Sequence, residues 1–311
     1  MAALVTVVLW SSAFAGIRVG LEGYSPGHLT LVRFLAASIG FVLYAAVARL
    51  RLPPIREWSR FALAGLFGVT IYHTALNWGQ TTVPAGIASV IIGTAPVFAS
   101  ILSHWFYGER LTSRRWAGFG LSLLGIGIMG LGGEPGSGFL FGVASVSLAA
   151  VCGAAHFVIM KGLVDRYHPV HAMAVATWMG TLPLLVFAPG LAAAVRQAPL
   201  ESTLAGIYIG LFPAGIAYAA WAIALARLPV SRASAFMYLV PPLAAGWGWL
   251  WANEVPTWRG IVGGLVALAG VAVVQLRSGA APERVQAPGG PPVSGDPSPA
   301  GQPAARTQSP G

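Results

Sequence analysis

Polar side chains recur at helical spacing in one otherwise apolar part of the chain. Thr70, His73, Asn77 and Gln80 follow one another at intervals of three, four and three residues, which places them on one face of an α-helix. Polar groups within a membrane usually face the bundle interior or a water-filled cavity. Their hydroxyl, imidazole and amide groups could bind a polar solute there. The same groups could instead hold neighbouring helices together through interhelical hydrogen bonds.

A second set of residues could bind an apolar side chain. Trp10 lies near the middle of one apolar stretch, and Tyr218 and Trp221 lie three residues apart in another. Aromatic rings at mid-depth can enclose an apolar group and still offer one hydrogen-bonding atom. We therefore expect these three residues to line a substrate site.

Serines, a tyrosine and two prolines add to this predicted site. Ser89 and Pro96 lie on one face of a predicted helix, about two turns apart. Ser234 and Tyr238 precede Pro241 on one face of a later helix. Each proline leaves a carbonyl without its helical donor, and such a carbonyl must find a partner or line a wet cavity. We expect Pro96 and Pro241 to act as paired hinges, although each alone could equally be a static kink.

The charged residues limit which solutes the site could take. None of the nine acidic residues lies deep in a predicted helix, whereas a carrier exchanging protons for cationic drugs usually needs a carboxylate in the membrane. A sugar phosphate would favour several Lys or Arg in the cavity, and Arg33 is the only one that lies within a span away from its ends. Because Arg33 lies in the outer third of its helix, snorkelling or pairing with backbone carbonyls is favoured. The remaining site suits a neutral or zwitterionic metabolite, such as an amino acid.

Other titratable and metal-binding groups are few. His73 and His156 could couple transport to protons, or could remain neutral interior groups. Glu109 and Glu254 each precede a Thr by three residues, which favours helix capping and loop pairing. Cys152 is the single cysteine, so we expect no disulfide within the chain, no thiolate metal site and no cofactor.

The elements that must position these residues are membrane-spanning helices. The chain has 311 residues, of which 56% are hydrophobic and only 9% charged, against about 25% charged residues in a soluble domain. Apolar runs of about 20 residues predict transmembrane helices. We expect ten of them, at roughly 2–19, 27–48, 60–79, 84–106, 114–132, 138–160, 170–189, 203–225, 231–252 and 258–276.

Lys and Arg alternate between the connections in a way that predicts orientation. Twelve of them fall in alternate connections, and only Arg18, Arg196 and Arg259 fall in the others. Since cytoplasmic loops retain Lys and Arg, both termini are expected in the cytoplasm of a cell (inner) membrane protein. The net charge of +9 therefore reflects the Lys and Arg of the cytoplasmic connections. No nucleic acid partner is expected, because the basic residues form no single patch.

The chain repeats itself at an offset of 145 residues. Pro96, Glu109 and Thr112 correspond to Pro241, Glu254 and Thr257. A unit of five helices is odd in number, so its second copy must enter the membrane inverted, which is typical of secondary transporters. The prediction is an all-α membrane protein with two inverted five-helix repeats, at 1–134 and 135–277. Residues 278–311 hold eight prolines and no aromatic residue, which predicts a disordered cytoplasmic tail.

Several motifs carry a resemblance to a known family. They are Trp10-Ser11-Ser12-Ala13-Phe14, Arg33-Phe34, Pro96-Val97-Phe98 and Gly108-Glu109-Arg110-Leu111-Thr112, with the repeat counterparts Pro241 and Glu254. Over about 2–277 the chain resembles the EamA family of the drug/metabolite transporter superfamily, the ten-helix exporter type. The resemblance implies a cavity surrounded by helices 1–4 and 6–9, with helices 5 and 10 outside it. It also implies export of amino acids or other small metabolites, and a structural role for the Arg-Phe pair.

The sequence predicts a carrier of small metabolites that works by alternating access, and three other functions are its alternatives. A drug, sugar or nucleotide-type carrier of the same superfamily is the nearest alternative. A membrane-embedded enzyme would need a nucleophile with a base, paired carboxylates or a metal cluster, and the spans hold no Ser-His-Asp set or close acidic pair. A purely structural or receptor-like bundle leaves the repeat unexplained. The expected partners are a small-molecule substrate and the lipid bilayer, and the sequence leaves a homodimer open.

Overall fold

The protein is helical wherever the structure describes it. The structure is a computed structural model that describes residues 1–48, 50, 52–107, 112–131, 138–218, 220–221 and 236–275, and these residues contain no β-strand. The α-helices are α1 (Ala2–Leu21), α2 (Pro26–Ala48), α3 (Trp58–Gly65), α4 (Tyr72–Gly79), α5 (Ala85–Gly93), α6 (Ala95–Tyr107), α7 (Ser113–Gly130), α8 (Phe139–Val164), α9 (Pro169–Leu184), α10 (Leu191–Gln197), α11 (Leu200–Leu211), α14 (Val240–Ala252) and α15 (Trp258–Gln275). Two 3-10 turns, η1 (Ile55–Glu57) and η3 (Leu185–Phe187), and two π-helical segments, η2 (Leu66–Ile71) and η4 (Phe212–Ile216), complete the order.

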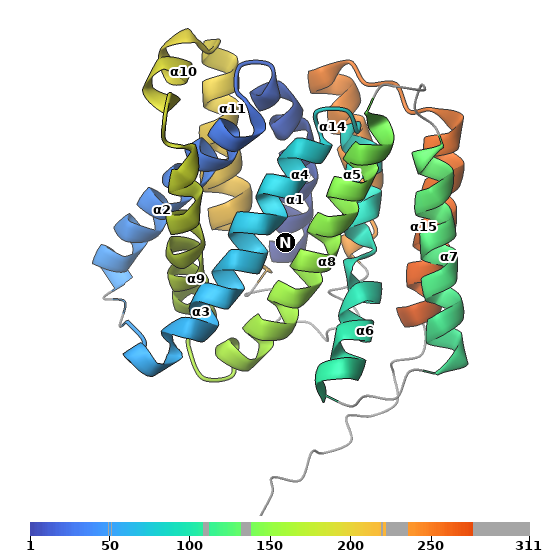
Figure 1. Ribbon diagram of the computed structural model, residues 1–311, viewed down its shortest axis with the longest axis horizontal. Coiled ribbons are helices and arrows are strands. Elements are labelled where there is room, and N and C mark those ends of the chain that lie inside the picture. The colour runs from blue at the N-terminus through green and yellow to red at the C-terminus, as the bar shows by residue number, and fades with distance from the viewer. Residues whose placement is uncertain are drawn as a thin grey trace, which may run out of the picture. The chain divides into compact units, whose positions relative to one another are not determined.

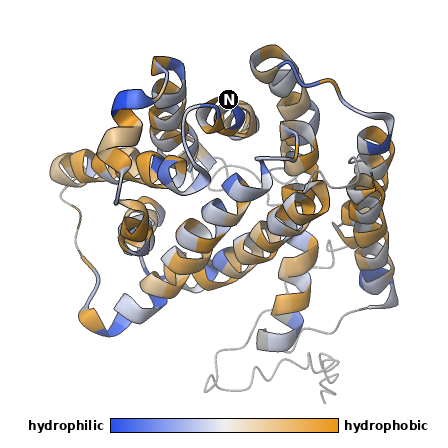
Figure 2. Ribbon diagram, turned by 45° about the horizontal axis from the view of Figure 1, so that its top comes forward, coloured by the Kyte–Doolittle hydropathy of each residue, from blue (hydrophilic) through white to orange (hydrophobic). Residues whose placement is uncertain are grey.

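In the part of the chain that the structure describes, five helical segments are long and apolar enough to cross a membrane. They are Ala2–Leu21, Pro26–Ala48, Ala85–Leu102, Phe139–Val164 and Pro169–Phe187, and Leu200–Ile216 and Trp258–Val274 are shorter apolar helices. Figure 2 shows orange and pale residues along most of the helices, with the deepest blue mainly at helix ends and connections. Large apolar side chains such as Leu43, Phe141 and Leu265 are exposed, as expected where lipid replaces water. These features agree with an all-α membrane protein.

Local sequence explains where several helices begin and end. The Thr112 hydroxyl accepts a hydrogen bond from the Arg115 N–H at 3.4 Å, and the Thr257 hydroxyl accepts one from the Gly260 N–H at 3.1 Å. These two threonines therefore cap α7 and α15, as their spacing after Glu109 and Glu254 predicts. Asn253 adopts the left-handed conformation with φ 51° and ends α14, a position that tolerates Asn.

The helix predicted over 60–79 and the one predicted over 84–106 are interrupted. η2 separates α3 from α4, and α5 is separated from α6 at Thr94, two residues before Pro96. Proline cannot donate the helical hydrogen bond, which favours such a break. In the second half of the chain, η4 follows α11, and the backbone turns at residues 238–239 before Pro241. π-Helical segments inside helices often mark functional sites.

α7 and α15 form a close pair at one edge of the bundle (Figure 1). Glycines make the approach possible, since a Cβ at Gly125 would lie 2.5 Å from the Gly263 carbonyl oxygen, and one at Gly270 would lie 2.6 Å from that of Gly118. Between these contacts the Ser122 hydroxyl donates to the Ala267 carbonyl at 3.2 Å. Small residues at such spacing let membrane helices pack backbone to backbone.

α1 and α8 each pack against several other helices. α1 packs against α11 and α14, whereas α8 packs against α4, α5 and α6. α2 packs against α11 and α9, and α3 packs against α9. Segments from the beginning and the end of the chain therefore lie side by side, as Figure 1 shows for α1 and α14. This interleaving brings the predicted site residues of both halves together.

Candidate functional site

A cavity of about 390 Å³ lies among these helices, within the size range of small-molecule sites. Most of its lining is apolar. The lining residues are Trp10, Ala13, Phe14, Ile17, Arg33, Gly68, Tyr72, His73, Leu76, Ser89, Ile92, Gly93, Ala95, Pro96, Gly153, His156, Phe157, Pro213, Tyr218, Trp221, Met237, Tyr238, Val240, Pro241, Leu268 and Val271. The lining includes Leu268 and Val271 of α15 but no residue of α7, so one of the two helices expected outside the cavity contributes to it.

Three aromatic residues predicted from the sequence meet at this cavity. The Trp10 ring centroid lies 5.4 Å from that of Tyr218 and 5.7 Å from that of Trp221. The Trp10 indole N–H donates to the Pro213 carbonyl at 3.2 Å, so η4 fixes the orientation of the ring. Together they form an aromatic wall, which we define as Trp10, Tyr218 and Trp221. Such a wall can pack against an apolar group of a solute.

Polar and charged lining residues come from α2 and from the start of α4, next to η2. Arg33 and His73 both line the cavity and are 4% and 5% exposed, respectively. The His73 ring lies 4.6 Å from Phe34 and 4.4 Å from Tyr72, measured between centroids. The Arg33 guanidinium lies 5.5 Å from the Phe34 centroid, a cation–π distance. The expectation that Arg33 snorkels or pairs with carbonyls is wrong for Nε and Nη1, which have no hydrogen-bond partner within the described residues.

The predicted polar stripe does not line the cavity as a unit. Only His73 does so, whereas the Thr70 hydroxyl donates to the Gly180 carbonyl at 2.7 Å. The Asn77 amide donates to the Thr30 hydroxyl at 2.8 Å, and the Gln80 amide donates to the Phe14 carbonyl at 3.0 Å. Thr70 belongs to η2, and the extra residue of a π turn rotates the flanking side chains by about 100°. This rotation applies to Thr70 relative to His73. Thr70, Asn77 and Gln80 all make the interhelical contacts that were the alternative interpretation.

The serine, tyrosine and proline predictions fall mostly at the cavity. Ser89, Tyr238, Pro96 and Pro241 line it, and Ser234 lies outside the described residues. The Ser89 hydroxyl donates to the Gly86 carbonyl at 2.6 Å, which fixes its rotamer. Helix breaks immediately precede both prolines, so each proline lies where a helix changes direction beside the cavity.

His156 is a hydrogen-bonded interior group at the same cavity. Its Nδ1 lies 2.9 Å from the Ala64 carbonyl oxygen. Gly68 faces the ring so closely that a Cβ at this position would overlap with Nδ1. The glycine therefore leaves the space that the imidazole occupies. Within the described residues no three His, Cys, Asp or Glu side chains lie close enough together to hold a metal ion.

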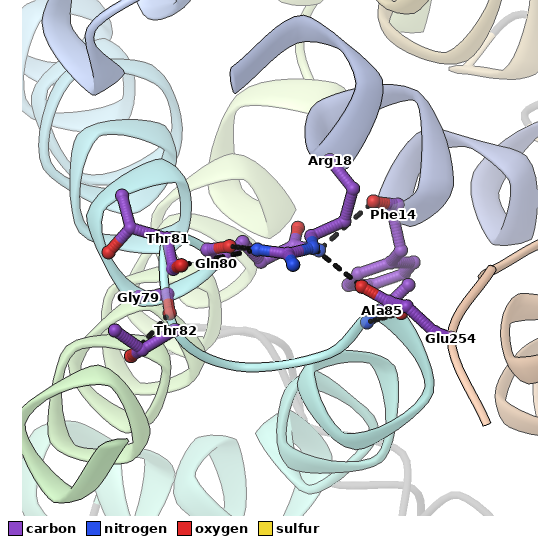
Figure 3. Close-up of polar contacts among 8 residues, drawn as sticks. All are labelled: Phe14, Arg18, Gly79, Gln80, Thr81, Thr82, Ala85 and Glu254. Carbon is purple, nitrogen blue, oxygen red and sulfur yellow. Dashed lines mark hydrogen bonds and ion pairs between the residues drawn. The ribbon is translucent and has the colours of Figure 1, made fainter. Parts of the chain in front are cut away.

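A group of polar contacts around Arg18 joins helices next to cavity-lining residues. Arg18 follows the lining residue Ile17, and its Nε lies 2.5 Å from Glu254 Oε1. The other carboxylate oxygen of Glu254 accepts from the Ala85 N–H, at the start of α5, at 2.7 Å. Figure 3 shows Arg18 reaching from α1 to Glu254 on one side and to the Gln80 and Thr81 carbonyls on the other. We call Arg18, Glu254 and these contacts the closure.

The closure agrees with loop pairing as the expected role of Glu254. It joins α1, the end of α4, the start of α5 and the residues after α14. The sequence did not indicate that Arg18 and Glu254 pair with each other, because 236 residues separate them. Repeat correspondence relates Glu254 to Glu109, not to Arg18.

Comparisons with known proteins identify the family. The model of the EamA-like transporter family matches residues 1–131 and 140–276. The chain belongs to this family. The resemblance found in the sequence is thereby confirmed.

Individual relatives of this EamA-like chain are transporters by name. It is 38% identical over 269 residues to the "Uncharacterized transporter YdfC" of Bacillus subtilis, covering 86% of this chain and 88% of the relative. It is 37% identical over 277 residues to the "Probable terminal-alkyne amino-acid exporter" of Streptantibioticus cattleyicolor, covering 89% and 93%. It is 28% identical over 241 residues to the "Uncharacterized inner membrane transporter YedA" of Escherichia coli, covering 76% and 77%. A solved crystal structure aligns over 88% of this chain and 95% of its own with a TM-score of 0.56 and 22% identity, which concerns the fold alone.

Family and relatives indicate a membrane transporter and not an enzyme. An EamA-like transporter acts on a small-molecule substrate within a lipid bilayer, which agrees with the exposed apolar helices. The sequence had not placed Arg33, Tyr72, Phe157 or His156 in the predicted binding set. For Arg33 a signal was present, namely a permanent charge inside a span.

Proposed function

We propose that this EamA-like chain is a secondary carrier that exports an amino acid, or a similar neutral or zwitterionic metabolite, by alternating access. It crosses the cytoplasmic membrane with ten helices, as two inverted five-helix repeats at 1–134 and 135–277. Both termini lie in the cytoplasm, with the tail 278–311. The observation that carries the proposal is the cavity, whose lining is drawn from both repeats.

Matched irregularities support the inverted repeat. η2 begins at Leu66 and η4 at Phe212, and the helix breaks at Thr94 and Leu239 precede matched prolines. Ser122 hydrogen-bonds to Ala267, which is 145 residues away and is its own repeat counterpart. Two corresponding residues meet in this way only near a pseudo-twofold axis.

Helix contacts support the same relation. α1 packs against α14 and α11, and their proposed counterparts pair likewise, as α8 with α6 and α8 with α3. The pair α2–α11 corresponds in the same way to α9–α3. The family model matching two separate stretches also supports two units of similar length. A site between inverted repeats is the usual arrangement for alternating access.

The closure supports alternating access, because a carrier must seal its site on one side at a time. Arg18 follows the lining residue Ile17, and its ion pair with Glu254 joins elements of both repeats. An ion pair that is partly exposed, at 28% and 12%, can exchange its partners for water when the helices separate. By the distribution of Lys and Arg the side where Arg18 lies faces the cell exterior.

The lining supports an amino acid as the solute. Apolar side chains and the aromatic wall suit an apolar substituent. Pro96 and Pro241 cannot donate to the carbonyls of Ile92 and Met237, four residues earlier, and Ile92 and Met237 both line the cavity. Such carbonyls can accept hydrogen bonds from an ammonium group. The name of the relative from Streptantibioticus supports both an amino-acid solute and the direction of export.

Cationic drugs and sugar phosphates receive less support. No carboxylate is found among the described lining residues, and Arg33 is the single permanently charged residue among them. A proton-coupled drug carrier would need a carboxylate in the lining. A phosphate site would favour a group of Arg or Lys.

Counterflow in proteoliposomes tests the proposed function. Vesicles loaded with unlabelled amino acid should transiently accumulate the radiolabelled form, with L-phenylalanine, L-leucine and L-propargylglycine as probes. The propargyl compound is a simple terminal-alkyne amino acid. A carrier gives counterflow because labelled solute that enters is diluted in the unlabelled pool, which competes with it for the way out, whereas a membrane enzyme gives none. Counterflow absent for all three, in protein that unfolds cooperatively, would reject an amino-acid carrier.

A further inference from the structure

Arg33 is a permanent charge buried without a matching acid. It lies in α2 about 10 Å from the helix start, at 1.5 Å per residue, and is 4% exposed. Its Nε and Nη1 make no hydrogen bond within the described residues, and no carboxylate there forms an ion pair with it. The Phe34 ring is the one cation–π partner found for this guanidinium in the described part of the chain.

Such a group is costly unless something binds it. A buried charge without a partner destabilises a fold, and guanidinium groups cannot lose their proton in proteins. Charged residues in a membrane usually pair with each other or face a functional pathway. Because Arg33 lines the cavity, its missing partner can arrive there as part of the solute.

We propose that Arg33 binds the carboxylate of the transported solute, an inference that rests on the proposed carrier function. Guanidinium donors form a fork that matches the two oxygens of a carboxylate. A phosphate monoester carries nearly two charges, and the described lining offers no second Arg or Lys to share them. The single charge of a carboxylate therefore matches the single charge of the site.

The rest of the cavity fits a solute held in this way. The aromatic wall and Arg33 line the same cavity of about 390 Å³, so an acid held at Arg33 can pack its apolar substituent against Trp10 or Tyr218. Tyr72 and His73 line the cavity as well, and His73 Nδ1 is a buried atom without a hydrogen-bond partner in the described residues. These two side chains are available for a carboxylate oxygen that the guanidinium leaves unsatisfied.

Calorimetric binding to purified protein tests the assignment with matched probes. The acids are L-phenylalanine and L-leucine, the controls without a carboxylate are L-phenylalaninol and L-leucinol, and phenyl phosphate tests the phosphate alternative. Variants are Arg33→Gln, Arg33→Lys and the exposed control Arg196→Gln. Loss of a hydrogen bond to a charged group should weaken acid binding about 10- to 150-fold in Arg33→Gln. Arg33→Lys should weaken it less, because a point charge replaces a fork.

Stability separates binding from a structural role. If Arg33 lacks a protein partner, Arg33→Gln should melt without ligand at the same temperature as the parent or higher. A structural role predicts a lower melting temperature and equal weakening for acids and alcohols. If Arg33→Gln cannot be purified, Arg33→Lys carries the test, since it keeps the charge and should still prefer acids over alcohols.

The outcomes distinguish the inference from the proposed function. Acid binding that is lost only in the Arg33 variants supports the assignment. Equal binding of acids and alcohols by the parent, or unchanged acid binding in Arg33→Gln, overturns it while counterflow can still establish a carrier. Tighter binding of phenyl phosphate than of either acid overturns the choice of carboxylate. If no probe binds, both the role of Arg33 and the proposed amino-acid carrier are overturned.

Discussion

Weakening the closure should open the cavity toward the side where Arg18 lies. In the substitution Glu254→Gln one carboxylate oxygen becomes an amide nitrogen, while the groups it faces, Arg18 Nε and the Ala85 N–H, are both donors. One of the two hydrogen bonds is therefore lost, and the other becomes a bond to a neutral acceptor. With bonds to charged groups contributing about 1.5–3 kcal/mol and neutral ones about 0.5–1.5 kcal/mol, the loss is about 2–3 kcal/mol.

That loss converts into a population shift that labelling can measure. About 2 kcal/mol corresponds to a roughly 30-fold change in the equilibrium between closed and open. The assay uses Cys152→Ser protein with Ser89→Cys as a reporter, because Ser89 lines the cavity and is 1% exposed. A membrane-impermeant thiol reagent should label residue 89 more than tenfold faster from the Arg18 side in Glu254→Gln. Labelling from the other side should slow.

A matched ion-pair variant controls for general effects of charge. Arg60→Gln removes an exposed pair with Glu57, at 3.2 Å, and neither residue lines the cavity; exposed pairs contribute little. It should leave both labelling rates unchanged. The reasoning is refuted if Glu254→Gln labels like the parent, or if labelling rises equally from both sides.

Three further predictions concern the cavity and the packing that supports it. Tyr218→Ala should reduce counterflow at least tenfold, because it removes part of the aromatic wall, whereas Trp105→Ala, at a side chain 75% exposed, should not; intact flux in folded Tyr218→Ala protein would reject the wall as a binding surface. Gly68→Ala should lower the melting temperature by several degrees, since the added methyl overlaps with His156 and overpacking costs about 1–3 kcal/mol; an unchanged midpoint would contradict this packing. Gly125→Ala should likewise lower it by forcing α7 from α15, whereas Gly120→Ala, with nothing within 4 Å of its Cβ, should not; equal effects of the two would show that the close approach is not required.

The sequence predicted the site best where chemistry depended on depth alone. Trp10, Tyr218 and Trp221 were expected together as aromatic residues within apolar runs, and the structure brings the rings of Tyr218 and Trp221 within 6 Å of the Trp10 ring. Pro96 and Pro241 were expected at matched depth from the repeat, and both lie at the cavity. Their action as hinges stays a prediction.

Prediction from the sequence was weakest where the direction of a side chain decided the outcome. The polar stripe was drawn on an ideal helix, but η2 changes the register between Thr70 and His73. Arg33 was expected to snorkel or to pair with backbone carbonyls because of its distance to the helix end, although a charge inside a span more often faces the bundle interior. The pairing of Arg18 with Glu254 depends on packing between elements far apart in the chain, which no local pattern encodes.

The central claim is that two half-molecules lie antiparallel around the solute cavity. The most direct test is to measure on which side of the membrane two connections lie. In a Cys152→Ser background, Arg56→Cys and Arg196→Cys place single thiols in exposed positions of η1 and α10. Labelling of intact and inverted vesicles should find residue 56 on the cytoplasmic side and residue 196 outside. Reaction of both thiols from the same compartment would contradict the inverted arrangement and, with it, the alternating-access site between the repeats.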